Sequence, residues 1–119
     1  MGLREDFEHE RAGLQERLQA RGNRNIKRYL SCDHACYQDG ALAARDKELL
    51  GLTASAVLRC DDCIRYHLIR CHDLGFTAEQ LMEALEVALV VGGSIVIPHA
   101  RRAVALLDEL EAARGTTGP

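Results

Sequence analysis

Apolar residues recur every three or four positions along most of this 119-residue chain, and this spacing constrains the fold more than any other feature. Residues at that spacing lie on one face of an α-helix. Ala, Leu, Glu and Arg, which favour helices, dominate, and runs of β-branched or aromatic residues are scarce. We therefore expect an all-α protein, folded as a compact bundle of about five to six helices.

Glycine, proline and capping residues divide the chain into separate helices. The clearest boundary is Gly75, which can end one helix just before Thr77 to Gln80 begins the next as a capping box. Gly22 should end the first helix in a left-handed conformation, and Gly92-Gly93 with Pro98 should interrupt the chain near its end. The helices are expected over residues 3–21, 25–38, 43–58 and 61–74, from about 77 to the glycine pair, and from there to about 113.

The length of the chain fits one domain with one core, and no linker divides it. We expect residues 1–119 to form a single domain, with residues 1–22 as a peripheral N-terminal helix. The first helix carries an apolar stripe of Leu3, Phe7, Leu14 and Leu18. In the second helix the positions expected to be buried are Ile26, Tyr29, Leu30 and Ala35.

Charge and hydropathy exclude several classes of function. The net charge is −3 and the 15 basic residues are dispersed, so no nucleic-acid partner is expected. The most apolar stretch, residues 84–98, contains Glu86 and two glycines and is too short to cross a membrane. The acidic N-terminus lacks the apolar core of a signal peptide, so we expect a cytoplasmic protein. Five cysteines in that compartment favour a transient, catalytic disulfide over a structural one.

The segment Cys60-Asp61-Asp62-Cys63-Ile64-Arg65-Tyr66-His67 combines a C-x-x-C pair with a histidine four residues later. On a helix the two cysteines share a face at a Cα separation of roughly 5–5.5 Å, which a disulfide tolerates. His67 lies one turn beyond Cys63, where its imidazole can accept the thiol proton. The segment thus predicts a redox couple with its own base.

A helical projection of this segment places one set of side chains toward the core and another toward solvent. The residues expected to face inward are Cys60, Cys63, Ile64, His67, Cys71 and Leu74, and those expected to face outward are Asp62, Arg65, Ile69 and Arg70. The attacking sulfur stays open at this point, because the helix N-terminus favours the thiolate of Cys60 whereas His67 favours that of Cys63.

With Glu48 included, the pattern E-x11-C-x-x-C-x-x-x-H resembles the alkyl hydroperoxidase D/carboxymuconolactone decarboxylase family. The likeness extends over about residues 43–107, the core region, and includes Ser55, the turn Gly75-Phe76-Thr77, and a Gly-Gly helix that runs into Pro98, Ala100 and Ala103. It implies an AhpD-like helical domain with the C-x-x-C at the N-terminus of a central helix.

The same resemblance implies a thiol peroxidase and disulfide oxidoreductase of peroxiredoxin type. Glu48 and His67 would form a proton relay, Cys63 would attack the hydroperoxide, and Cys60 would resolve the product as a disulfide. No cofactor or metal is needed, but an external thiol or dithiol, such as a lipoyl or thioredoxin-like protein, must reduce the disulfide. Family members assemble as rings, which implies a homo-oligomer, a trimer or hexamer. This chain departs from the family at Asp62, where well-studied members have histidine, and we expect Asp62 to be a solvated first-turn residue.

Three alternatives stay open. Cys60, Cys63 and His67 could bind zinc with Cys71 or His72 as a fourth ligand, although ligands on one helix surround a metal poorly. A carboxymuconolactone decarboxylase-like lyase is a second alternative, but that branch lacks the C-x-x-C pair. A redox-sensing helical oligomer without turnover is the third.

The remaining cysteines and histidines have less specific settings. Cys32 and Cys36 are four residues apart, and packing as a buried or half-exposed pair is favoured over a second redox or metal site. Cys71 is expected to pack passively. His72 and His99 are expected to be surface or core residues, although His99 after Pro98 could line a cleft.

Overall fold

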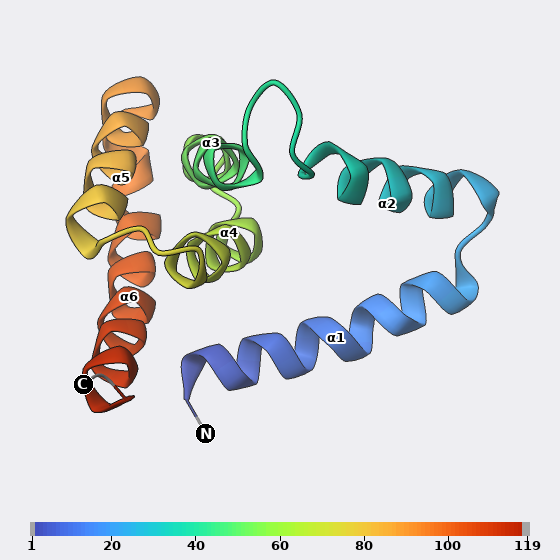
Figure 1. The fold of residues 1–119 in the computed structure, drawn as a ribbon, viewed down its shortest axis with the longest axis horizontal. Helices are drawn as coiled ribbons and strands as arrows, with labels where there is room; N and C mark the ends of the chain where they lie inside the picture. The colour runs from blue at the N-terminus through green and yellow to red at the C-terminus, as the bar shows by residue number, and fades with distance from the viewer. Residues whose placement is uncertain (1, 118–119) are drawn as a thin grey trace. The chain divides into compact units, whose positions relative to one another are not determined.

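The computed structural model describes residues 2–117, and the side chains of residues 2–115. Over these residues it contains six α-helices and one short 3-10 helix and no strand, so the expected all-α fold is confirmed (Figure 1). The elements are α1 (Leu3–Arg21), α2 (Arg24–Cys36), α3 (Ala44–Val57), α4 (Asp61–Asp73), α5 (Ala78–Gly92), η1 (Ser94–Val96) and α6 (Ile97–Thr117).

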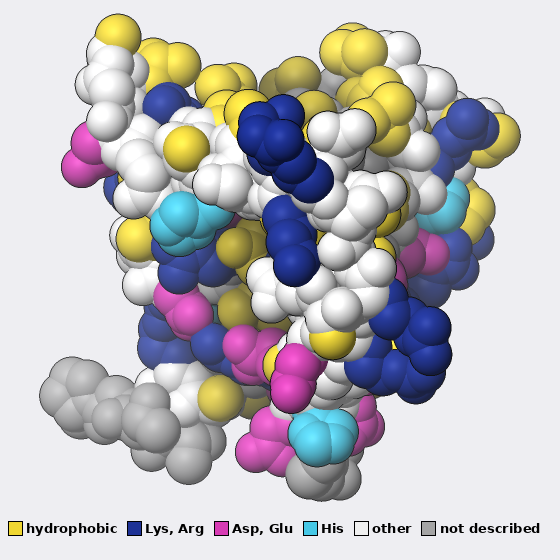
Figure 2. Space-filling view, turned by 90° about the vertical axis from the view of Figure 1, so that its right-hand side faces the viewer, with side chains coloured by type: hydrophobic (Ala, Val, Ile, Leu, Met, Phe, Trp, Pro, Cys, Tyr) yellow, Lys and Arg dark blue, Asp and Glu magenta, His cyan; other side chains and the backbone are white. Residues whose placement is uncertain are grey.

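The chain divides into two compact units, Met1–Ala44 and Arg45–Pro119. The single domain over residues 1–119 stays a prediction. None of the described helices is long and apolar enough to cross a membrane. The surface seen in Figure 2 carries exposed hydrophobic side chains among side chains of both charges.

The first unit contains α1 and α2, and α1 has the bounds that the sequence predicts. Gly22 is extended, with φ −64° and ψ 138°, so the left-handed cap expected there is wrong. Asn23 instead begins α2 at once, because its side chain accepts a hydrogen bond of 3.0 Å from the Ile26 backbone N–H. Neither helix buries a residue within the chain, so the burial expected for Ile26, Tyr29, Leu30 and Ala35 of α2 is wrong.

The second unit holds the hydrophobic core. Helix α4 packs against α5 and α6 (Figure 1). The fully buried large side chains come from α3, α4, α5 and η1, and include Leu52, Ile64, Leu68, Leu81, Leu85 and Val96. This packing surrounds α4 over a wide arc and fixes its position relative to α6.

Local turn chemistry sets the boundaries within this unit. Gly75 has φ +96°, and Thr77 and Gln80 make both hydrogen bonds of the predicted capping box, at 2.9 and 3.1 Å. Gly93 has φ +84° and ends α5, as the glycine pair predicts. Pro98 lies in the first turn of α6, where proline fits because its missing N–H would have no helical partner.

The connection from α3 to α4 contains the one described non-glycine residue with positive φ, Arg59 at 61°. Cys60 N–H donates to Ser55 O at 3.1 Å and Arg59 N–H donates to Ala56 O at 3.0 Å. This pair of bonds is the Schellman motif, in which glycine usually occupies the left-handed position. Arginine there carries a steric cost that glycine would avoid.

Replacing Arg59 with glycine should therefore raise the free energy of unfolding by about 1 kcal/mol. Urea unfolding followed by circular dichroism measures the change. Gly75→Ala is the matched control, because it places a Cβ at another position of positive φ and should lower the free energy of unfolding. A destabilised Arg59→Gly variant would show that the arginine side chain contributes more than its backbone strain costs.

Candidate active site

The first turn of α4 positions the C-x-x-C pair. Cys60 is the N-cap, with extended φ −100° and ψ 100°, and its carbonyl accepts the bond of 2.9 Å from Ile64 N–H that starts the helix. Neither cysteine is in a disulfide; Cys60 is half-buried and Cys63 is exposed. A helix N-terminus stabilises negative charge, so this position favours the thiolate over the thiol.

Glu48 of α3 and His67 of α4 meet in the interior, 19 residues apart in sequence. Glu48 Oε2 lies 2.8 Å from His67 Nδ1, and their side chains are only 4% and 10% exposed. A carboxylate can only accept, so Nδ1 carries the proton and Nε2 is the ring nitrogen that can take up or release another. The other Glu48 oxygen lies 3.6 Å from Arg70 Nε. The pair is thus an oriented imidazole one turn behind Cys63.

Tyr66 restricts the same imidazole from the side. Its ring meets the His67 ring edge-on, with centroids 5.2 Å apart and an interplanar angle of 78°. Adjacent aromatic residues on a helix are common, and no sequence signal marks this one. The contact adds to the hydrogen bond from Glu48 in limiting rotation of the His67 ring.

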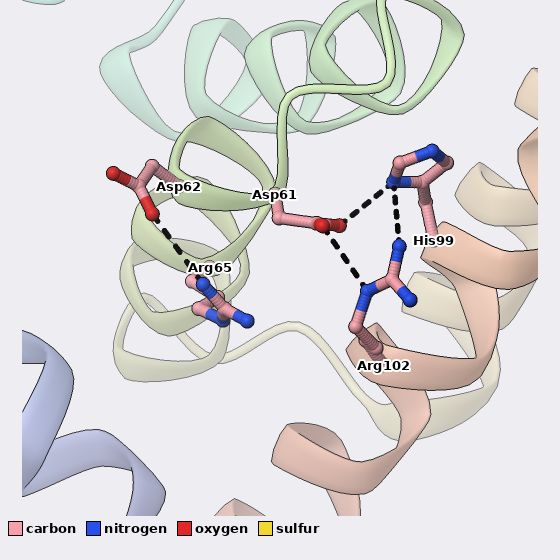
Figure 3. Close-up of polar contacts among 5 residues, drawn as sticks. All are labelled: Asp61, Asp62, Arg65, His99 and Arg102. Atoms are coloured by element: carbon pink, nitrogen blue, oxygen red, sulfur yellow. Dashed lines mark hydrogen bonds and ion pairs between the residues drawn. The ribbon is translucent and has the colours of Figure 1, made fainter.

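A second carboxylate–histidine cluster, missed by sequence reasoning, lies at the N-terminal end of α4 (Figure 3). Asp61 Oδ1 lies 2.8 Å from His99 Nδ1, and Asp61 Oδ2 accepts a hydrogen bond of 3.1 Å from Arg102 Nε. Burial of Asp61 opposes its ionisation, but His99 and Arg102 outweigh burial and hold the pKa of Asp61 below its ordinary value. The partners are 38 and 41 residues away, so no local pattern could have indicated them.

Asp62 and His72 of α4 have different surroundings. Asp62 is 83% exposed and lies 3.4 Å from Arg65, so it is the solvated first-turn residue that was expected. His72 is buried, with Nε2 2.6 Å from Glu111 Oε2. Arg114 approaches His72 Nδ1 at 3.1 Å and donates to the His72 carbonyl at 2.7 Å. The cluster of His72, Glu111 and Arg114, which sequence reasoning also missed, joins the C-terminal end of α4 to α6.

The helical projection of α4 is partly wrong. Cys63 and Leu74 are exposed, and Ile69, expected to face solvent, is only 4% exposed. The projection assumes one buried stripe, but α5 and α6 both cover α4. Cys60 precedes the helix, so its direction does not follow helical spacing.

The other three cysteines differ from one another in exposure. Cys71 is fully buried, and burial together with the charge of Glu48 raises the pKa of its thiol to about 12. Such a thiol is unreactive near neutral pH. Cys32 and Cys36 are exposed on α2, so their expected packing as a buried or half-exposed pair is wrong. Among the described residues, no group of three or more His, Cys, Asp and Glu side chains is placed to hold a metal ion.

The fold and site define an all-α protein that presents a dithiol at a helix N-terminus, with a buried carboxylate–imidazole pair one turn behind it. The chain belongs to the carboxymuconolactone decarboxylase family, whose model matches residues 26–106.

Solved structures and curated proteins agree with this membership. A Thermotoga maritima protein of the family, for which a role in the antioxidative response has been suggested, is 53% identical; 94% of this chain and 95% of that one align, with a TM-score of 0.89. A Legionella pneumophila family member, lpg0406, is 25% identical over 90% of this chain and 96% of its own, with a TM-score of 0.72. Uncharacterized protein 4 in the cox locus of Paracoccus denitrificans is 35% identical over 71% of this chain and 77% of its own.

Proposed function

We propose that this protein is a thiol-dependent peroxidase and disulfide oxidoreductase that reduces hydroperoxides through Cys63 and Cys60. One observation carries the proposal: the buried 2.8 Å contact between Glu48 and His67 orients an imidazole one turn behind an exposed cysteine at a helix N-terminus. The arrangement combines an activated thiol with a proton donor for the leaving group. The antioxidative role suggested for the Thermotoga relative agrees with this activity.

The proposed oxidation has two steps, which are followed by reduction of the disulfide. The Cys63 thiolate attacks the peroxide O–O bond, an S–O bond forms, and the departing alkoxide or hydroxide takes a proton from His67. The Cys60 sulfur then attacks the Cys63 sulfenic acid, and water leaves as the disulfide forms. An external dithiol donates two electrons and two protons to restore both thiols.

Exposure supports Cys63 as the first nucleophile. Cys63 is exposed and can meet a peroxide from solvent, whereas Cys60 is half-buried in the connection before α4. The same exposure allows the thiol of a reducing protein to reach Cys63, and a lipoyl or thioredoxin-like protein in the cytoplasm would be a suitable reductant.

The proposal is tested by single-turnover oxidation of the reduced, metal-free protein with hydrogen peroxide and an alkyl hydroperoxide. The wild type should lose two thiols rapidly, Cys60→Ser should accumulate a sulfenic acid at Cys63, and Cys63→Ser should be inert, as read by thiol titration and mass spectrometry. Equal, slow reaction of all three proteins would disprove the peroxidase mechanism. Thiol–disulfide exchange of the same proteins with a dithiol would then separate redox sensing from catalysis.

An apolar face of α5 supports assembly with further copies of the chain, as a trimer or hexamer. Val87, Val90 and Val91 share one side of the helix and are 52%, 82% and 68% exposed in the single chain. Ile95 of η1, three residues beyond α5, is 54% exposed. Exposed apolar side chains of this kind are an aggregation hazard unless a partner covers them, and closed symmetry lets identical copies do so.

A further inference from the structure

Two carboxylates lie between the redox cysteines, Asp61 and Asp62. A negative charge beside a thiol disfavours the thiolate by like-charge repulsion, and the thiolate is the form that reacts. The helix N-terminus offsets part of this effect, since it stabilises negative charge in the first turn. The sequence between the cysteines therefore works against the chemistry proposed for them unless another group compensates its charge.

Asp61 is compensated from another helix. Residues 99 and 102 are three apart in α6, and both side chains turn toward the start of α4 (Figure 3). Arg102 Nε lies 3.1 Å from one Asp61 oxygen and His99 Nδ1 lies 2.8 Å from the other. A carboxylate only accepts, so His99 Nδ1 carries a proton, and the 3.3 Å approach of Arg102 Nη2 to that nitrogen adds no second hydrogen bond.

Asp62 has a weaker arrangement. Its side chain is 83% exposed and its partner, Arg65, lies 3.4 Å away on the same helix. Water screens an exposed charge of this kind, and a pair three residues apart on a helix surface contributes little. Asp61 is only 29% exposed and is the neighbour of Cys60, so its charge acts on the thiols with less screening.

We propose that Arg102 and His99 are positioning residues for Asp61: Arg102 neutralises its carboxylate and His99 holds it by a hydrogen bond, so that the first turn of α4 can stabilise the thiolate of Cys60 or of Cys63. The proposal rests on the proposed function for its purpose, but its physical content is the ionisation of the thiols. The charged and titratable groups of these elements include Glu48 of α3, Arg59 of the connection, Asp61, Asp62, Arg65 and His67 of α4, and His99 and Arg102 of α6. Of these, only His99 and Arg102 contact Asp61.

The test is the pH dependence of alkylation of the reduced full-length protein by iodoacetamide, read for each cysteine by peptide mass spectrometry. Arg102→Gln should raise the midpoints of Cys60 and Cys63 by about 0.5 pH units, because the Asp61 charge is no longer balanced. His99→Gln should move them in the same direction. Asp61→Asn alone should lower them, and the double variant Asp61→Asn/Arg102→Gln should return to the wild-type profile.

Matched controls separate this effect from a structural one. Arg101→Gln removes an exposed positive charge from the same helix, at a residue that does not contact Asp61, and should leave the profile unchanged. Cys32 and Cys36, on α2, should keep their profiles in every variant. An unchanged midpoint in Arg102→Gln, or a shift that persists in the double variant, would overturn the proposal. Should Arg102→Gln fail to fold, an unchanged or raised midpoint in Asp61→Asn would overturn it equally.

This readout needs no peroxide. If Cys63 does not react with peroxides, the proposed function is wrong, but the alkylation profiles can still support compensation of the Asp61 charge. If the protein reduces peroxides but Arg102→Gln has an unchanged alkylation profile, the proposed function stands and the proposed charge compensation is wrong.

Discussion

His67→Gln should lower the second-order rate constant for oxidation of Cys63 by a hydroperoxide by about 10²-fold or more. His67 is the group placed to protonate the departing oxygen, and glutamine keeps much of the side-chain volume but cannot transfer a proton at neutral pH. Stopped-flow mixing of the reduced protein with peroxide, over pH 5–9, measures the rate constant. Over this range the wild type should react faster than the variant.

Glu48→Gln is the matched control, because it keeps the shape of the Glu48–His67 pair and removes the negative charge of Glu48. The glutamine oxygen can still accept the bond from His67 Nδ1, which Glu48 accepts at 2.8 Å, but it no longer stabilises an imidazolium. We expect a smaller loss of rate, about 10-fold, with the fold retained. An unchanged rate in His67→Gln would show that solvent protonates the leaving group and that the buried pair is only structural.

Val90→Glu should convert the assembled protein into single chains. Val90 is 82% exposed in the single chain, so the substitution should change the stability of the isolated fold little, whereas a carboxylate in an apolar interface is buried without a partner. Size-exclusion chromatography with light scattering, at several protein concentrations, gives the mass of the wild type and of the variant.

Glu79→Lys is the control for this prediction, because it changes an exposed charge in the first turn of the same helix, about three turns before Val90. It should leave the assembly intact. A monomeric wild type, or a Val90→Glu variant that keeps the wild-type mass, would contradict assembly through this face.

The helices were predictable wherever a local signal sets their ends. Gly75, Thr77 and Gln80 act within a few residues of one another, so their turn and capping box could be predicted from the sequence. The positions of Cys63 and His67 on successive turns of α4 were predictable for the same reason, because helical spacing alone determines them. Glu48 is 19 residues from His67, and only the resemblance to the family indicated it.

The contacts that sequence reasoning missed are made by segments that are distant in the sequence and meet only through packing. His99 and Arg102 meet Asp61, and Glu111 meets His72, only because α6 lies along α4. The burial of Ile69 has the same origin, because a helix covered by two others has more than one buried side. Helical spacing correctly predicts that α1 and α2 carry apolar positions, but it does not determine whether another part of the chain covers them.

The two polar clusters hold α4 against α6 at both ends of α4. Asp61 at one end of α4 is tied to His99 and Arg102, and His72 near the other end is tied to Glu111 and Arg114. These ties are separated by most of a 13-residue helix, about 20 Å long, which limits how far α4 can tilt or slide. If Cys60 and Cys63 form the proposed disulfide, they would do so while the backbone of α4 is held against α6 at both ends.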